Sequence, residues 1–112
     1  MILLTTTSEV IKLITADATD IDTHVSAVDK HQSTGAISEY DLDSAITTAT
    51  TTTICAAPAA TTTRNVKFIS IVNRDTTSTT VTLQHYNGSI AVDIYPPTVL
   101  SPNAAIIYSD GF

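Results

Sequence analysis

The sequence predicts an all-β protein with one antiparallel β-sandwich domain, of jelly-roll or immunoglobulin-like type, over residues 1–112. Short runs rich in valine, isoleucine and threonine recur at intervals of about 8–14 residues, which is typical of about seven or eight short strands. No segment has the helical period of apolar side chains that marks an amphipathic helix. A chain of 112 residues also suits one compact core rather than two.

The first half of the chain predicts three strands and one long loop. Residues 10–15 are rich in β-branched side chains, which favour extended backbone. Residues 21–28 alternate between apolar and polar side chains, and this period of two indicates a half-buried strand. Residues 29–44 are polar and rich in turn-forming residues, so they predict a surface loop that a partner could order. Residues 45–55 are dominated by threonine and predict the third strand.

The second half contains the clearest predicted strand, at residues 65–73. Its nearly continuous valine, phenylalanine and isoleucine content indicates a central strand that is buried on both faces. Two short strands, at residues 98–100 and 104–108, are expected to close the sandwich. The core is predicted to lie within residues 64–108 and to include Val66, Phe68, Ile69, Ile71, Val81, Leu83, Ile90, Val92 and Ile94.

A β-hairpin is predicted between these strands. Residues 79–86 and 90–95 alternate on either side of Asn87-Gly88, a dipeptide that is typical of a two-residue type I′ turn. Pro96-Pro97 is expected to end the hairpin, because proline has no N–H to donate to a neighbouring strand.

Charge and hydropathy exclude two classes of partner. The net charge is −6 and only 14% of the residues are charged. A nucleic acid needs clustered basic side chains, and the chain has only Lys12, Lys30, Arg64, Lys67 and Arg74. No apolar run approaches the length of roughly 18 residues that spans a bilayer, so no membrane partner is expected. The acidic first half either is a solvated face or complements a basic partner.

The sequence predicts neither an enzyme nor a cofactor, because none of the common catalytic or phosphate-binding motifs is present. His24 and His31 lie near acidic residues, so they are either surface histidines or metal ligands. His85 is expected to be half-buried and hydrogen-bonded. The single cysteine, Cys55, is expected to be a buried, inert thiol rather than a nucleophile.

A calcium site is the alternative interpretation of the acidic segment at residues 17–22, which places several oxygen donors close together. An EF-hand loop needs a glycine at its sixth position and a glutamate at its twelfth, and this segment has neither. Solvated carboxylates in a turn are the simpler interpretation. The sequence leaves calcium binding open.

The ends of the chain are unusually apolar for a solitary soluble domain. Residues 1–8 are therefore predicted to form an interaction arm that is ordered only against a neighbouring subunit or a larger assembly. The predicted interface residues are Met1, Ile2, Leu3, Leu4, Tyr108 and Phe112.

Several segments resemble small β-rich proteins of tailed bacteriophages. In those proteins a threonine-rich strand and an Ala-Pro linker precede a strand that begins Arg-Asn-Val-Lys and ends in asparagine. A hairpin and a tail with Tyr-x-Asp-Gly-Phe follow. The matching positions are 53–58, 64–73, 81–85, Gly88, Leu100, Tyr108 and 110–112. This chain has Asn103-Ala104 where such proteins usually have Gly-Glu, and residues 1–44 are similar only loosely.

The resemblance implies a virion structural protein that is made in the host cytoplasm. A capsid decoration (cement) protein is favoured, bound to the major capsid protein or other virion proteins as a homo-oligomer, with a trimer favoured. A head–tail or tail component is the nearest alternative. A small carbohydrate-binding module that presents Tyr40, Tyr86 and Tyr95 is another, although the chain lacks tryptophan and is only 5% aromatic. The resemblance carries over no catalytic residue.

Overall fold

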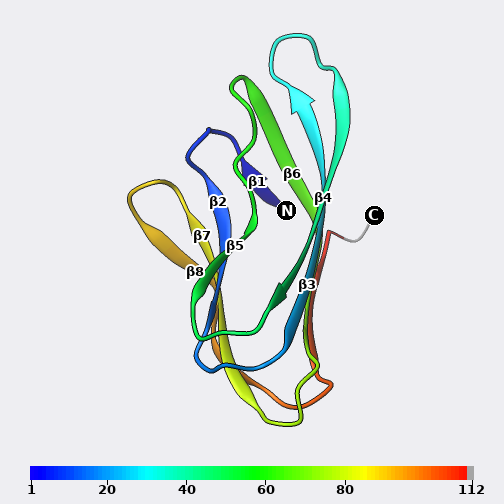
Figure 1. Cartoon of the computed structure of the whole chain (residues 1–112). Helices are drawn as coiled ribbons and strands as arrows, with labels where there is room; N and C mark the ends of the chain where they lie inside the picture. Colours follow the sequence, from blue (N-terminus) through cyan, green and yellow to red (C-terminus); the bar gives the residue numbers. More distant parts are fainter. Residues whose placement is uncertain (111–112) are drawn as a thin grey trace.

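The structure is a computed structural model in which residues 1–110 are described. It contains two antiparallel sheets that pack face to face, which confirms the predicted β-sandwich (Figure 1). Nine strands are present in the described part of the chain: β1 (Ile2–Leu4), β2 (Val10–Thr15), β3 (Ile21–His31), β4 (Ile37–Ile46), β5 (Thr51–Cys55), β6 (Thr62–Asn73), β7 (Thr79–Tyr86), β8 (Ala91–Leu100) and β9 (Ala105–Ser109).

The larger sheet, sheet A, has the order β1-β6-β3-β4, and β9 also pairs with β6. β1 lies opposite residues 64–66 and β9 lies opposite residues 68–72, so these two short strands follow each other along one side of β6. Sheet B has the order β5-β2-β7-β8. The edges of the sandwich are therefore β1 with β9 and β4 in sheet A, and β5 and β8 in sheet B.

The core lies between the sheets because alternate residues of the inner strands point inward. β2 and β3 show this alternation most clearly, with every second residue buried over most of their length. Each fully buried leucine or isoleucine contributes about 1.5–3 kcal/mol relative to an exposed one. The buried apolar residues are Leu4, Ile11, Leu13, Ile21, Val25, Ala27, Ile46, Ile54, Cys55, Val66, Ile69, Ile71, Val81, Leu83 and Leu100.

β6 is central, as its sequence predicts, but the prediction that both of its faces are buried is wrong. Val66, Ile69 and Ile71 point into the core, whereas Phe68 is only half-buried. The ring of Phe68 lies 6.1 Å from that of His24 on the neighbouring strand. Residues 1–110 form two layers, and no third layer among them covers the outer face of sheet A.

The predicted surface loop at residues 29–44 is wrong, because most of this segment is a hairpin. β3 continues to His31, β4 begins at Ile37, and their pairing extends to Lys30 opposite Ile37. Gly35 has a φ of +72°, which a glycine adopts without strain at this turn. The segment is polar because β4 is an edge strand with both faces largely in solvent. The polar composition of this segment therefore does not distinguish an exposed edge strand from a surface loop.

The predicted continuous strand at residues 45–55 is also interrupted. β4 ends at Ile46 in sheet A and β5 begins at Thr51 in sheet B. The intervening residues carry the chain from one sheet to the other.

The β7–β8 hairpin exists, but its turn has four residues instead of two, because Tyr86 pairs with Ala91. The side chain of Asn87 accepts hydrogen bonds from the backbone N–H of Ser89 (2.9 Å) and of Ile90 (2.8 Å). Only Gly88 has a positive φ, of +98°, and a Cβ there would meet the Cβ of Ser8 at 2.9 Å. Glycine is therefore required at this position by both conformation and space.

Pro96 and Pro97 do not end this hairpin, and residues 98–100 are not a separate strand. β8 continues through both prolines to Leu100. This is tolerated because β8 is an edge strand and its pairing with β7 shifts register at this point. Ile90, Val92 and Ile94, which were predicted in the core, are exposed.

The N-terminal residues are not a free arm that needs a partner for order. β1 pairs with β6 of the same chain, and Leu4 is fully buried in the core. Leu3 points the other way and is exposed.

Leu4→Ala is expected to lower the free energy of unfolding by about 2 kcal/mol, at the low end for a buried leucine because a three-residue strand can adjust. Urea denaturation followed by circular dichroism measures the loss. Leu3→Ala is the matched control and should leave stability nearly unchanged. Equal stability of the two variants would contradict the placement of β1.

Candidate interaction surfaces

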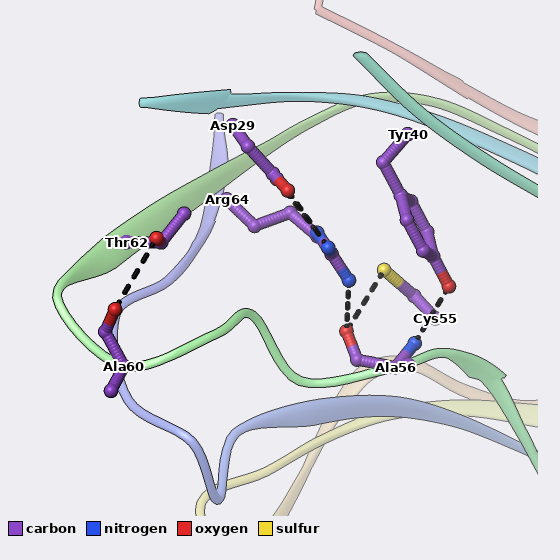
Figure 2. A network of polar contacts seen from close by, with 7 residues as sticks. All are labelled: Asp29, Tyr40, Cys55, Ala56, Ala60, Thr62 and Arg64. Carbon is purple, nitrogen blue, oxygen red and sulfur yellow. Dashed lines mark hydrogen bonds and ion pairs between the residues drawn. The ribbon is translucent and has the colours of Figure 1, made fainter. Parts of the chain in front are cut away.

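A polar network between the two sheets surrounds Arg64 (Figure 2). Its Nε and Nη2 atoms each donate to one carboxylate oxygen of Asp29 at 2.8 Å, and its Nη1 donates to the backbone oxygen of Ala56 at 2.7 Å. The Tyr40 ring lies 3.6 Å from the guanidinium carbon, and the Tyr40 hydroxyl accepts from the Ala56 N–H at 3.1 Å. β3, β4 and β6 of sheet A thereby hold the chain where it leaves β5 of sheet B.

The polar groups of this network form hydrogen bonds with one another. The network therefore stabilises the fold and presents no group to a ligand. The neighbouring thiol of Cys55 is buried, as the sequence predicts. Burial raises the pKa of Cys55 to about 11, although the nearby Arg64 opposes the shift. A thiol with this pKa is almost wholly protonated at neutral pH and is a poor nucleophile.

Cys55 is therefore expected to resist a thiol-specific reagent such as dithionitrobenzoate in the native protein at pH 8 and to react fully in urea. The absorbance of the released thionitrobenzoate measures both rates. A native rate that approached the rate in urea would contradict the buried position of this side chain.

The structure separates the predicted interface residues. Met1 and Leu3 are exposed, Ile2 and Tyr108 are partly buried against the core, and Leu4 is inside it. Phe112 lies outside the described residues. The two terminal segments do meet: the Met1 amine lies 3.6 Å from the carboxylate of Asp110, and Lys67 Nζ lies 3.0 Å from the same carboxylate. The predicted terminal patch is therefore reduced to Met1 and Leu3 in the described part of the chain.

An exposed apolar strand lies at the edge of sheet B. The sequence pattern did not predict its exposure. Seven consecutive residues of β8, from Ala91 to Pro97, are exposed. Val92 pairs with His85 of β7 and is still 58% exposed, and Val99 is 67% exposed. The turn of the β7–β8 hairpin lies well apart from that of the β3–β4 hairpin (yellow and cyan in Figure 1). We call Ile90, Val92, Ile94, Tyr95 and Val99 the β8 edge.

A second apolar surface lies on sheet A. A shallow groove of about 490 Å³ has Leu3, Val28 and Ile37 as its large apolar side chains. These residues come from β1, β3 and β4, and Ile37 is 69% exposed. Lys30 and Lys67 are its basic residues. We call this surface the sheet A groove, lined by Leu3, Val28, Lys30, Gln32, Ile37, Thr63, Asn65 and Lys67.

The three histidines lie at separate places and each has a local partner. His24 Nδ1 lies 2.5 Å from a carboxylate oxygen of Asp43 on the outer face of sheet A. The Nδ1 of His31 accepts backbone N–H groups of the β3–β4 turn, from Ser33 and Thr34. His85 is half-buried and its Nε2 lies 3.1 Å from Glu9, so the predicted half-buried environment is confirmed.

Carboxylates of the acidic segment at residues 17–22, for which a solvated turn or a calcium site was considered, bind other side chains of the protein. Asp17 accepts the hydroxyl of Thr79 at 3.0 Å, and Asp22 lies 3.0 Å from the guanidinium of Arg74. Within residues 1–110, no three His, Cys, Asp or Glu side chains are grouped so that they could hold a metal ion.

The three tyrosines considered for carbohydrate binding do not form one platform. Tyr40 belongs to sheet A and is held in the Arg64 network, whereas Tyr86 and Tyr95 belong to sheet B. Lys12 Nζ covers the Tyr86 ring at 3.9 Å. Tyr95 remains exposed, on the β8 edge.

Stability is expected to be lost in acid because three carboxyl groups have lowered pKa values. Backbone N–H groups, that of Thr76 first, lower the pKa of Asp75; the Thr5 hydroxyl lowers that of Glu9, and Lys67 lowers that of Asp110. The unfolded chain binds these protons more readily. The three carboxylates therefore contribute their full stabilisation above the ordinary carboxyl pKa of about 4. This contribution is lost as the pH falls through their lowered pKa values in the folded protein.

Urea midpoints between pH 7 and pH 2.5 measure this loss. Asp75→Asn removes one titrating group and should make the decline below about pH 4 shallower. An identical decline in the variant would show that Asp75 does not contribute.

Comparison with protein-family models, curated proteins and solved structures gives no match for this chain. The described residues include no helix that is long and apolar enough to cross a membrane. The candidate sites thus rest on the geometry of the two apolar surfaces, the β8 edge and the sheet A groove.

Proposed function

We propose that this chain is a virion structural protein, a capsid decoration protein that binds the capsid surface as a homo-oligomer and stabilises the shell. The observation that carries the proposal is the β8 edge, an apolar strand left uncovered on a small domain. Such a surface is characteristic of a protein that functions in an assembly. The sequence resemblance to small β-rich proteins of tailed bacteriophages supports the same conclusion.

The size of the β8 edge fits this role. Five large apolar side chains that are about half exposed together present roughly 450 Å² of apolar surface, within the range of about 300–600 Å² for the largest patch on a typical monomer, which is often functional. One such contact holds weakly after ordering costs, because specific stable interfaces usually bury about 1,200–2,000 Å² in total. A closed oligomer repeats the contact, and several subunits acting together bind a particle through high effective concentration. A trimer on local threefold axes is the favoured arrangement.

The proposed role is not enzymatic. The histidines and the thiol of the described residues are engaged locally, and the buried polar groups around Arg64 and Asn73 bind other groups of the fold. A carbohydrate-binding role is less well supported because Tyr40, Tyr86 and Tyr95 do not share one face. A head–tail or tail component would use the same apolar surfaces, so experiment must separate it from a capsid protein.

Sedimentation with purified virion parts tests the proposal. The full chain is mixed with DNA-free, expanded heads of the tailed phage that encodes it, stripped of their surface proteins, and in parallel with isolated tails. Saturable binding to heads, with a rise in the temperature at which the shell melts, is the expected result. Binding to tails alone would replace the capsid role by the tail role, and binding to neither would exclude both.

A further inference from the structure

Lys30 is the unpaired cation of the described structure. Among residues 1–110, the other four basic side chains each have a partner: Lys12 lies over the Tyr86 ring, and Arg64, Lys67 and Arg74 are paired with Asp29, Asp110 and Asp22. Lys30 is exposed, lines the sheet A groove and has no carboxylate or ring partner within these residues. The groove therefore combines an apolar floor with one free positive charge.

The β8 edge has the complementary character. Asp93 is the one charged residue between positions 86 and 100, and it lies in β8 between the exposed residues Val92 and Ile94. Its carboxylate accepts a hydrogen bond from the Gln84 amide at 2.9 Å, which holds it in place at the strand surface without neutralising its charge. The edge is thus an apolar strip with one fixed negative charge.

We propose that the β8 edge of one copy of this chain docks in the sheet A groove of the next copy, with Asp93 beside Lys30. The assignment rests on the proposed function, which calls for a homo-oligomer, and it identifies the two surfaces that build it. The contact joins two different surfaces, so it is a head-to-tail contact that forms a closed ring when the rotation between copies closes. A dimer closes when a twofold axis brings both docking contacts together, and a trimer is the next larger ring.

Charge favours this arrangement over the contact of two β8 edges. Each copy has a net charge of −6, so two copies approach most easily where charges are few or opposite. A contact between two β8 edges would bring two Asp93 carboxylates together, whereas the sheet A groove supplies a cation. A foreign acidic partner would satisfy Lys30 but would leave the β8 edge of the same chain in water.

The backbone of β8 indicates how the contact is made. Pro96 and Pro97 have no N–H group, and the pairing of β8 with β7 shifts register on both sides of Leu83. A neighbouring strand cannot extend sheet B continuously past these positions. The β8 edge therefore docks by its side chains in the groove instead of adding a strand to a second sheet. Each contact buries roughly 900 Å² in total, so we expect dissociation at low protein concentration.

Analytical ultracentrifugation of the purified full chain, without any particle, tests the proposal. The wild type should form a discrete oligomer. Asp93→Lys and Lys30→Asp should each raise the dissociation constant about tenfold or more, and the double variant should recover most of the loss because it restores the opposite charges. Asp41→Lys, an equal charge change on exposed β4 outside the groove, is the matched control and should have little effect.

Val92→Ser tests the apolar part of the contact. It replaces an exposed residue, so the melting temperature should stay the same while association weakens. A monomeric wild type at all concentrations, or an oligomer indifferent to changes at both Asp93 and Lys30, would overturn the proposal. A monomer that still binds heads would leave the capsid-binding role standing but not its homo-oligomeric form, and a ring that binds no virion part would remove the capsid-binding role alone.

Discussion

Replacing Arg64 by alanine is expected to lower the free energy of unfolding by about 3 kcal/mol, because the change leaves a carboxylate between the sheets without its cation. The side chains of Arg64 and Asp29 are only 8% and 13% exposed. Because water still reaches a small part of Asp29, the expected loss of stability is at the low end of the range of about 3–5 kcal/mol for breaking a buried ion pair. The backbone oxygen of Ala56 also loses its 2.7 Å donor.

Two further variants separate the charge from the packing. Arg64→Lys keeps the charge but cannot reproduce the planar, forked donation to Asp29, so an intermediate loss is expected. Arg64→Met with Asp29→Leu removes both charges and should be more stable than Arg64→Ala alone, since no unpaired ion remains. Urea unfolding followed by circular dichroism measures all three. If the double variant were the least stable, the ion pair would be more favourable than its desolvation cost implies.

The second large effect is expected for Ile69→Ala, which should cost about 2–5 kcal/mol through lost burial and the cavity that remains. Ile69 is 1% exposed on the central strand β6, where neighbours on β3 and β9 limit any collapse around the cavity.

Ile107→Ala is the matched control. It makes the same chemical change on the adjacent strand β9, at a side chain that is 57% exposed, and should cost about 0.5 kcal/mol or less. Equal unfolding midpoints for the two variants would mean that the inner and outer faces of sheet A have been interchanged.

The strands could be predicted from the sequence where the pattern is local. β3, β6 and β7 lie where alternating or β-branched runs predict them, because these features describe backbone that fits a pleated sheet. Whether the opposite sheet buries the side chains of a strand could not be predicted in the same way. Val25 and Val92 sit in similar alternating runs, yet one is buried and the other is largely exposed. The difference depends on whether the opposite sheet reaches that far.

The candidate surfaces were predictable to a smaller degree. Apolar residues near the N-terminus indicated an interface, and Leu3 does line the sheet A groove, but Leu4 is a core residue. The Arg64 network could not be predicted, because Asp29 is 35 positions away in the sequence and only the fold brings it to Arg64. Pro96 and Pro97 were the one available sign that β8 is an edge strand.

The order of the strands has a consequence for the time course of folding. Only β3–β4 and β7–β8 join strands that are consecutive in the chain; β2 must find β7, and β1 must find β6 about sixty residues away. A topology with so many non-local pairings has a high contact order, which typically gives folding times of milliseconds to seconds. The two hairpins form within microseconds, long before the sheets are complete. During that interval the apolar β8 belongs to a hairpin that is only marginally stable on its own, so we expect a newly made chain to be most open to premature association at this strand before the rest of the sandwich exists.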